Sequence, residues 1–302
     1  MSKRIVSINT PGIYLCEKDR QLEIWLNQER LSKIPIEDLG VLMIENHSVT
    51  VTCRLFDSLA TAGVVVSICD SFHLPNSILL PASGVALHAS RTRALALLSK
   101  PKKKRIWQQI ISAKIRLQAD VLTNRPVEQG QLRRLSTTVI SGDTSNLEAT
   151  AARTYWKVIF HEFEPSFTRS GDSVINVYLN YGYSVVRSAV ARGLVGAGFT
   201  PLFGVFHDSR DNAFALADDL FEVFRPYVDL MILNKLKSPG TLTDKSFKRE
   251  LLSILTTNLS FGGETCPFLA GIDRLILSFT RVVEGTTNRL EFPDLCEFRV
   301  ID

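Results

Sequence analysis

The feature that most constrains the fold is a change of hydrophobic periodicity near Pro81-Ala82-Ser83-Gly84. Before this stretch, short apolar runs show partial alternation and are separated by turn residues, a pattern typical of strands. After it, apolar residues recur at spacings of three and four, which indicates helices. We therefore expect an α+β protein, with a small β-rich N-terminal domain over residues 1–82 and a larger all-α domain over residues 83–302.

The expected N-terminal domain has seven or eight short strands and one helix. A short amphipathic helix over Leu55–Ala62 ends at Gly63 and leads into an apolar strand. The turns between strands carry Pro-Gly, Lys-Asp-Arg and Asn-Gln-Glu, which favour tight reversals. The predicted strands are Ile5–Ile8, Gly12–Cys16, Leu22–Leu26, Arg30–Ile34, Leu39–Ile44, Val49–Thr52, Val64–Cys69 and Ile78–Leu80.

The second domain is expected to contain helices alone. The segment 203–206 fits a short strand or a loop equally well, and no other strand is predicted there. The predicted helices cover residues 85–99, 102–123, 126–138, 145–162, 172–196, 213–234, 244–258 and 267–285.

The composition is that of a globular protein with no membrane segment. The chain has 302 residues, 45% of them hydrophobic and 22% charged. No apolar run approaches the roughly 20 residues that a membrane-spanning helix needs. The opening residues 1–6 lead directly into a strand pattern without a signal peptide, so we expect a cytoplasmic protein. The five cysteines are scattered without a CxxC pair, which argues against a zinc site or a disulfide framework.

The basic residues are concentrated in one segment. Residues 91–134 contain twelve lysines or arginines against two acids, whereas the whole chain has a net charge of only +4. Its densest part, Lys102-Lys103-Lys104-Arg105, lies where a helix is expected to begin, and positive charge there opposes the helix dipole. Although such a run can be merely a solvated helix start, its density indicates a phosphate-backbone partner.

A group of acids follows the only histidine in the stretch 203–222. His207 precedes a predicted helix in which Asp218 and Asp219 lie four and three residues before Glu222, so each pair shares a face. The spacing fits a solvated acidic face. It also fits a cluster in which a metal ion and a substrate phosphate could reach the carboxylates.

Glu148 has a local structural explanation as well. Ser145-Asn146-Leu147-Glu148 precedes an apolar helical pattern and matches the capping box, in which the glutamate bonds back to the helix start. Its position alone does not bring it to His207 or Glu222. The chain also lacks a P-loop, GxSxG, HExxH and a GxGxxG turn, so the sequence gives no support for nucleotide hydrolysis or for serine or zinc hydrolase chemistry.

Several segments together resemble the CRISPR-associated integrases of spacer acquisition, most closely their type II branch. They are residues 147–156 (LEATAARTYW), 179–183 (LNYGY), 204–207 (GVFH) and 217–226 (ADDLFEVFRP). The resemblance extends over nearly the whole chain, including the order of a β domain followed by helices.

The resemblance implies a metal site and names its ligands. In the family, a glutamate, a histidine and a later carboxylate coordinate Mg²⁺ or Mn²⁺, and the matching residues here are Glu148, His207 and Glu222. Asp219 matches a further catalytic acid that we place beside the metal rather than on it, whereas Asp218 has no counterpart. The residues expected to contact DNA are Arg91, Arg93, Lys102, Lys103, Lys104, Arg105, Arg153 and Arg225.

The implied reaction is strand transfer, in which the 3′-hydroxyl of a short DNA duplex attacks a phosphodiester at the border of a CRISPR repeat. The implied partners are double-stranded DNA, a second copy of the chain in a homodimer joined through the β domain, and a small ferredoxin-like companion protein. Two alternatives stay open: a metal-dependent nuclease or transposase of mobile DNA outside CRISPR defence, and a non-catalytic DNA-binding scaffold.

Overall fold

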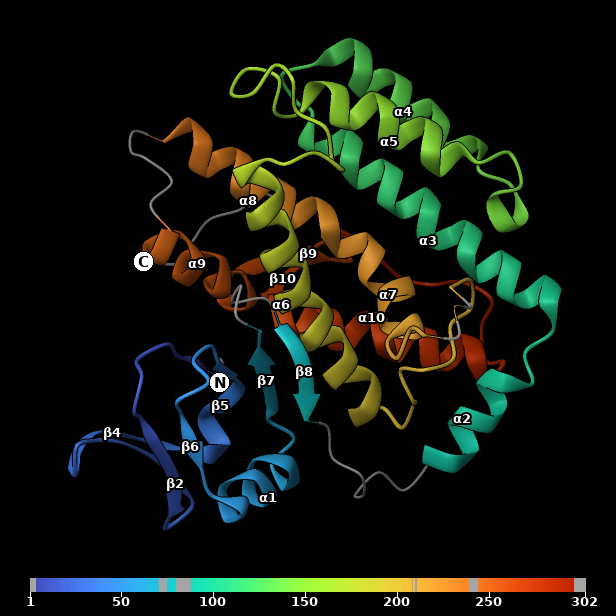
Figure 1. Cartoon of the computed structure of the whole chain (residues 1–302). Coiled ribbons are helices and arrows are strands. Elements are labelled where there is room, and N and C mark those ends of the chain that lie inside the picture. Colours follow the sequence, from blue (N-terminus) through green and yellow to red (C-terminus); the bar gives the residue numbers. More distant parts are fainter. Residues whose placement is uncertain are drawn as a thin grey trace. The chain divides into compact units, whose positions relative to one another are not determined.

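The computed structural model describes residues 4–70, 75–79, 88–207, 209, 211–238 and 244–295. The chain forms two compact units, Met1–Ala86 and Leu87–Asp302. Figure 1 shows most of the labelled strands in the first unit and most of the labelled helices in the second. The predicted boundary at residue 82 falls outside the described residues.

The first unit contains two four-stranded sheets. In one, the order is β1-β5-β7-β8, formed by Arg4–Ile8, Leu39–Ile44, Val65–Cys69 and Pro75–Leu79. Its β1, β5 and β7 are parallel and β8 is antiparallel. In the other, the order is β4-β3-β2-β6, formed by Glu29–Pro35, Gln21–Leu26, Tyr14–Lys18 and Thr50–Val51. These strands lie close to their predicted ranges.

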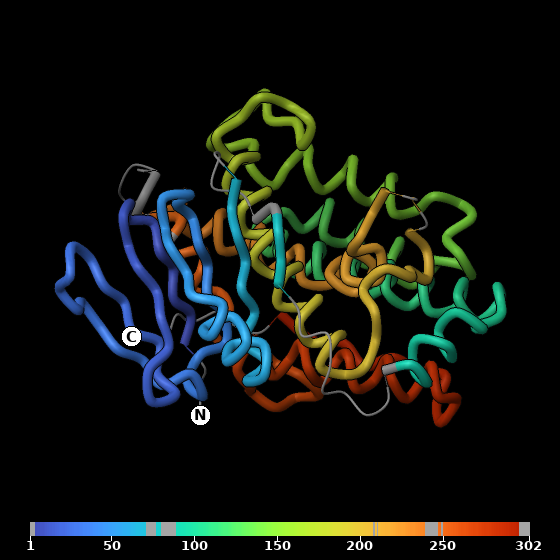
Figure 2. The backbone as a smooth tube through the Cα atoms, turned by 60° about the horizontal axis from the view of Figure 1, so that its bottom comes forward, coloured from blue at the N-terminus to red at the C-terminus, as the bar shows by residue number. Residues whose placement is uncertain are grey.

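Two tight hairpins connect β2, β3 and β4. The central residues Asp19-Arg20 and Asn27-Gln28 all have positive φ, between 48° and 66°, as two-residue hairpin turns of the favoured hand require. Figure 2 follows these strands as neighbouring segments of the blue trace. The turn residues noted in the sequence therefore occupy the reversals themselves.

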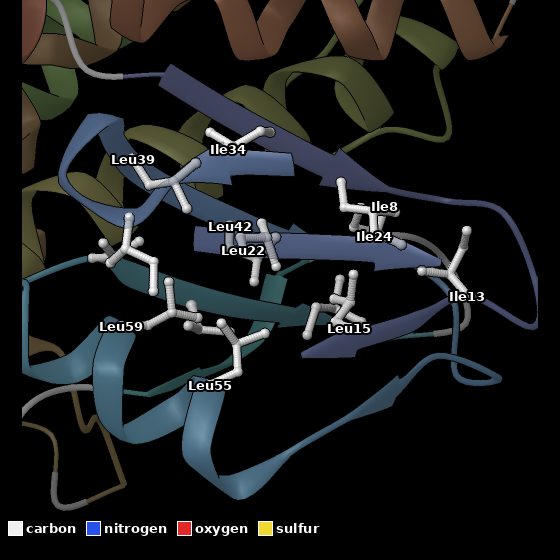
Figure 3. Packing of buried hydrophobic residues seen from close by; sticks show 14 residues of the cluster. Ile8, Ile13, Leu15, Leu22, Ile24, Ile34, Leu39, Leu42, Leu55 and Leu59 are labelled. Atoms are coloured by element: carbon white, nitrogen blue, oxygen red, sulfur yellow. The ribbon is translucent and has the colours of Figure 1, made fainter. Parts of the chain in front are cut away.

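The core of this unit lies between the sheets and one helix. Leu22 and Leu42, from different sheets, are both fully buried. Figure 3 shows them with Leu55 and Leu59 of helix α1, Cys53–Thr61, in one apolar cluster. Burial of such side chains contributes roughly 1.5–3 kcal/mol each, so this unit has a core of its own.

The second unit is mainly helical, and its longest described helices position the site. α3 and α4 lie side by side (Figures 1 and 2), and α3 also contacts α5, α7, η3 and α8. The helical elements are α2 His88–Ala96, α3 Lys100–Val121, α4 Pro126–Thr138, η2 Ser141–Asp143, α5 Leu147–Val158, α6 Val174–Gly196, α7 Ala215–Phe221, η3 Glu222–Phe224, α8 Arg225–Lys237, α9 Asp244–Leu252, η4 Ser253–Thr256 and α10 Phe268–Val283. None of the described helices is both long enough and apolar enough to span a membrane.

The expectation that this unit is all helical is wrong. β9 (Asn258–Phe261), β10 (Glu264–Pro267) and β11 (Pro293–Asp294) form a three-stranded antiparallel sheet in the order β10-β9-β11. β9 and β10 are joined through Gly262 and Gly263, which both have positive φ. The segment 203–206, for which a strand or a loop was open, contains no strand.

The helix predicted over residues 213–234 is divided. α7 ends at Phe221, a short 3₁₀ turn follows over Glu222–Phe224, and α8 begins at Arg225. Pro226 lies at the start of α8, where its missing N–H has no intrahelical partner to lose. Glu222 therefore lies in a tight turn between two helices rather than on the face of one continuous helix.

Candidate metal centre

The predicted metal ligands lie on elements that pack around α3. Glu148 is in the first turn of α5, and Glu222 begins η3. Both of these elements contact α3, as does α7, which carries Asp219. Figure 1 shows these elements within the helical unit. The middle of α3 is thus where segments distant in the sequence meet.

Lys114 of α3 joins the two glutamates. Its Nζ lies 2.6 Å from Glu148 Oε1, to which it donates a hydrogen bond, and 2.6 Å from Glu222 Oε2. The side chains of Lys114 and Glu222 are 10% and 5% exposed, whereas that of Glu148 is 27% exposed. One buried ammonium group therefore brings an oxygen of each carboxylate to a single point.

The contact between Lys114 and Glu222 is an ion pair without hydrogen-bond alignment. Glu222 Oε2 is buried and has no aligned donor among the described residues, although the ammonium nitrogen is close. The other oxygen of Glu222 accepts a hydrogen bond of 2.9 Å from Arg225 Nε.

Arg225 supports Glu222 rather than facing open solvent. Its guanidinium carbon lies 4.7 Å from the ring centres of both Tyr183 and Phe221, in cation–π geometry. Such contacts and the ion pair to Glu222 fix the fork of the side chain. The guanidinium that the resemblance assigns to DNA contact therefore holds a carboxylate of the site.

The charges of this group stabilise one another. Burial by itself would raise the pKa of Glu222, but Lys114 and Arg225 outweigh it and lower this pKa to about 2. Burial opposes the charged form of Lys114, but Glu222 and Glu148 outweigh it and raise the pKa of its ammonium group. Both glutamate and lysine are thus held in their ionised forms.

His207 is oriented by Asp219. The Nδ1 atom of His207 lies 2.7 Å from Asp219 Oδ1, and this hydrogen bond raises the pKa of the imidazole above its ordinary value. Because Nδ1 is engaged, Nε2 is the ring nitrogen left for a ligand. The pairing of a carboxylate with a histidine is the usual arrangement behind metal-bound imidazoles.

Asp219 also holds the loop that precedes α7. It is fully buried, and its carboxylate accepts backbone hydrogen bonds from Val205, Phe206 and His207 at 2.6, 3.1 and 3.1 Å. A Cβ on Gly204 would lie 2.2 Å from the carbonyl oxygen of His207 and 2.8 Å from Asp219 Oδ2. The turn can close around the carboxylate only because residue 204 is glycine.

Aromatic rings fix the other side of His207. Trp107 is 1% exposed. Its ring stacks on Phe206 with centroids 4.0 Å apart and meets His207 edge-on at 5.6 Å. The imidazole therefore has little freedom to rotate.

The predicted capping role of Glu148 is wrong. The N-cap residue of α5, Asn146, has a left-handed conformation and makes no side-chain cap. The carboxylate of Asp143 instead accepts the N–H groups of Leu147 and Glu148, at 2.9 and 3.0 Å. Since Asp143 satisfies the helix start, the side chain of Glu148 is free to turn toward Lys114.

A second buried acid ties the supporting helices together. Asp229 of α8 is fully buried and accepts hydrogen bonds from the hydroxyls of Tyr183 and Tyr155, at 2.5 and 2.9 Å. Burial raises the pKa of Asp229 to about 6 in spite of these two bonds. Tyr155 lies on α5 two turns after Glu148, so this cluster fixes α5 against α6 and α8.

Asp218, which the resemblance leaves without a role, has partners of its own. It accepts a hydrogen bond of 2.7 Å from Asn212 Nδ2 and lies 3.7 Å from Arg187 Nη1. It points to neither Lys114 nor His207 in any contact within the described residues.

The donor set fits a divalent cation. Two carboxylates and one imidazole nitrogen suit Mn²⁺ and tolerate Mg²⁺, and the unaligned Oε2 of Glu222 is a donor atom without a hydrogen bond. Among the described residues, no three His, Cys, Asp or Glu side chains are placed so that they could hold a metal ion together. Lys114 Nζ lies 2.6 Å from an oxygen of each glutamate instead. Glu148, Glu222 and His207 are the residues that would hold a cation.

The residues expected to contact DNA are separated into different environments. Arg91 is engaged, since it pairs with Glu284 at 2.9 Å and donates to the carbonyl of Ala197 at 2.8 Å. Arg93 and Arg153 are exposed. The run 102–105 forms no ion pair with any other described residue; Lys104 and Arg105 are exposed and the other two are partly so.

A basic hollow adjoins this run. It has a volume of about 550 Å³ and is lined by Arg105, Arg116 and Arg289, with Phe292 beside them and no acid among its described lining residues. Lys114 lies nine residues after Arg105 on α3, about 14 Å along the helix axis. The hollow and the metal centre are therefore two places on one helix.

Sequence reasoning missed the residues that organise the site. Lys114 lies among Ile110, Ile111 and Ile115 on a buried face of α3. A lysine on an apolar helix face is uncommon unless it is paired, and that signal was present in the sequence. Asp143 and Asp229 gave no comparable signal. Asp143 accepts hydrogen bonds from backbone N–H groups, which any residue type can supply. The tyrosine partners of Asp229 are distant in the sequence.

Comparisons with known proteins show the family of the chain. The family model for the CRISPR associated protein Cas1 matches residues 6–259. A CRISPR-associated endonuclease Cas1 of Neisseria meningitidis is 36% identical over 282 residues, which cover 91% of each chain. A Cas1 endonuclease of Saccharolobus solfataricus is 27% identical over 84% of each chain.

Solved structures share the fold. A casposase bound to its integration product has a TM-score of 0.77 and 20% identity, covering 97% of this chain and 93% of that one. A Cas1 protein of Thermotoga maritima has a TM-score of 0.75 and 18% identity, covering 93% and 97%. The resemblance noted in the sequence is confirmed, and the chain belongs to the Cas1 family of CRISPR-associated endonucleases.

Proposed function

We propose that this chain is a divalent-metal-dependent DNA integrase that inserts short foreign DNA fragments into a CRISPR array. The observation that carries the proposal is the approach of Glu148 and Glu222 to one buried ammonium group. His207 is held by Asp219 and lies near enough to Glu222 to interact with it electrostatically. Two acids and an imidazole from three separate segments are the donors that a Mg²⁺ or Mn²⁺ site needs.

The reaction is the attack of a DNA 3′-hydroxyl on a phosphodiester of the repeat border. A bound divalent cation would lower the pKa of the attacking hydroxyl and neutralise charge on the phosphate. Glu148, Glu222 and His207 are the residues that would hold it. Asp219 keeps the imidazole in one orientation, and Arg225 keeps the Glu222 carboxylate in place.

DNA is proposed to follow the basic surface of α3. The run 102–105 has no acidic partner among the described residues, and the adjoining hollow presents three arginines. Such a surface attracts the phosphate backbone of DNA, and the strength of this attraction depends on the salt concentration. Phe292 at the rim of the hollow adds a ring on which an unpaired base could stack.

The proposed assembly is a homodimer joined through the β unit, with a small ferredoxin-like companion protein. A solved complex named Cas6-RT-Cas1–Cas2 has a chain with a TM-score of 0.74 to this one. Among the described strands, β1 and β8 are the edges of one sheet and β4 and β6 those of the other, and edges of this kind permit pairing between copies.

The experiment is an integration assay with a labelled short duplex and a supercoiled plasmid that carries the repeat. Glu148→Gln, His207→Ala and Glu222→Gln should each reduce strand transfer by at least about 10²-fold, because each removes a metal donor, while binding of the duplex persists. The matched control is Glu162→Gln, which removes a carboxylate paired with Arg125 at 2.8 Å outside the site. Full activity of Glu222→Gln in Mn²⁺ would overturn the assignment.

The same assay separates the rival functions. The fold similarity to a casposase favours, as a second candidate, a transposase-like enzyme acting outside CRISPR arrays. Such an enzyme would insert equally well into a plasmid without the repeat, whereas the proposed enzyme requires it. A non-catalytic scaffold would bind DNA but show no Mn²⁺ binding in a titration.

A further inference from the structure

Lys114 is a charged residue in a place where charge is costly. Its side chain is 10% exposed, and its neighbours Ile110, Ile111 and Ile115 on α3 are fully buried. A buried ammonium group is tolerated only when carboxylates compensate the loss of water. Glu148 and Glu222 supply that compensation, each at 2.6 Å.

The two contacts of Lys114 are unequal. Toward Glu148 it donates an aligned hydrogen bond. Toward Glu222 it is close but unaligned, and Oε2 of that residue has no hydrogen-bond donor among the described residues. Both contacts have the same length of 2.6 Å, so Lys114 shares its charge between the two carboxylates, and only its contact with Glu148 is an aligned hydrogen bond.

The two glutamates that face Lys114 are also the carboxylates assigned to the metal. An ammonium group and a divalent cation cannot both occupy the space between two oxygens that each lie 2.6 Å from one nitrogen. Like charges at such separations repel strongly when water is excluded. The four-carbon stem of lysine allows its head to move while the helix stays in place.

We propose that Lys114 is a positioning residue that acts as a built-in counter-ion. In the metal-free protein it holds Glu148 and Glu222 together, and a divalent cation enters as the ammonium group withdraws from Glu222. The inference rests on the proposed metal-dependent function and adds a competitor that sets how tightly the metal binds.

The test is the affinity of the purified full chain for Mn²⁺, without DNA, measured by calorimetry. Lys114→Met and Lys114→Gln should bind Mn²⁺ at least about tenfold more tightly than the wild type, because the competing charge is gone. Lys114→Arg, which keeps the charge, should not tighten binding. Lys235→Met is the matched control, since Lys235 also pairs with a glutamate, Glu250, at 2.6 Å but lies outside the site.

Thermal unfolding supplies a second readout. Without metal, the Lys114→Met protein should melt at a lower temperature than the wild type, because two carboxylates lose their counter-ion. Mn²⁺ should raise its melting temperature more than that of the wild type. If both uncharged variants are unfolded without metal, recovery of the folded protein by Mn²⁺ supports the inference, and failure to recover overturns it.

The outcomes separate this inference from the function on which it rests. Equal or weaker Mn²⁺ binding by folded Lys114→Met and Lys114→Gln overturns the role of Lys114 and leaves the metal-dependent function standing. If neither the wild type nor any Lys114 variant binds Mn²⁺, the metal-dependent function fails, and the inference fails with it.

Discussion

Asp219 shows how one buried carboxylate can organise both a loop and a histidine. It is fully buried, and its hydrogen bonds run to three backbone N–H groups and to the imidazole of His207. Removing such an acceptor leaves several donors unsatisfied. Its role is therefore both to shape the loop and to fix the histidine.

We expect Asp219→Asn to lower the pKa of His207 and to destabilise the fold. The wild-type hydrogen bond raises the pKa of His207. It therefore stabilises the folded state fully only below about pH 6.5, the ordinary pKa of histidine. This stabilisation is lost as the pH rises through the raised pKa of the folded protein. The variant should lose roughly 2–4 kcal/mol of unfolding free energy. NMR titration of the imidazole and urea unfolding measure the two effects.

Asp218→Asn is the matched control, because it changes the neighbouring acid, which bonds to Asn212 instead. Its effect on the pKa of His207 should be smaller than that of Asp219→Asn. Equal shifts in the two variants would show that the imidazole responds to nearby charge in general and not to its hydrogen bond with Asp219.

The sequence allowed prediction of individual site residues only where a resemblance named them. Spacing placed Glu222 on an acidic face, and local pattern made Glu148 a helix cap. The cap is in fact Asp143, whose side chain reaches four residues forward across a left-handed turn at Asn146. Glu148 and Glu222 come together because α3 packs against both of the segments that carry them. Packing between helices that are distant in the chain produces no local pattern in the sequence.

Among the elements, Asp229 links three helices through hydrogen bonds in the core. Tyr155 on α5 and Tyr183 on α6 both donate to this residue of α8. Glu148 lies in the first turn of α5, and Glu222 lies in the 3₁₀ turn that leads into α8. The cluster therefore fixes the two segments that carry these glutamates relative to each other. Loosening it should disturb the site from a distance.

We expect Asp229→Asn to remove a pH-dependent part of the stability. The pKa of Asp229 is about 6 in the folded protein, against an ordinary value of 3.8. Between these pH values the folded state binds more protons than the unfolded state. The stability of the wild type therefore falls as the pH rises from about 4 to 6. Relative to the variant, the wild type should lose about 3 kcal/mol over that range. Urea unfolding at several pH values measures this difference.

Tyr155→Phe provides the control, since it removes one hydrogen bond but keeps a titratable carboxylate. Its stability should still decline over the same acidic range. A wild-type curve parallel to that of Asp229→Asn would mean that the carboxyl group does not titrate there.

Most elements of the fold were predictable, because alternation and helical spacing extend over many residues. The three strands of the helical unit were missed for a physical reason. β9 and β10 have four residues each, and β11 has two. Strands this short do not show enough alternation of apolar and polar residues to be distinguished from the end of a helix. Their pairing partners are also partly distant, since β11 joins β9 across the whole of α10.

For the whole molecule, the change of periodicity predicted two parts, and the chain forms two compact units. The distribution of charge added a basic segment that the fold places along α3. What could not be predicted is the hollow beside it, because Arg289 and Phe292 reach it from a segment near the C-terminus. The segment is fixed there by hydrogen bonds between Gln109 and residues 288 and 290.

The basic run makes a prediction that concerns DNA binding by the whole protein. Replacing Lys102, Lys103 and Lys104 together by Gln should weaken binding of duplexes of any sequence, since phosphate contacts carry no sequence information. The slope of log K against log salt should decrease by about 2–3, close to one for each lost phosphate contact. Fluorescence anisotropy over a range of salt concentrations measures this slope.

A control of equal charge replaces three arginines that are paired with acids outside the run, namely Arg125, Arg133 and Arg274. If both triple variants change the slope equally, net charge rather than the run attracts the DNA, and an unchanged slope in the lysine variant removes the run from the DNA path.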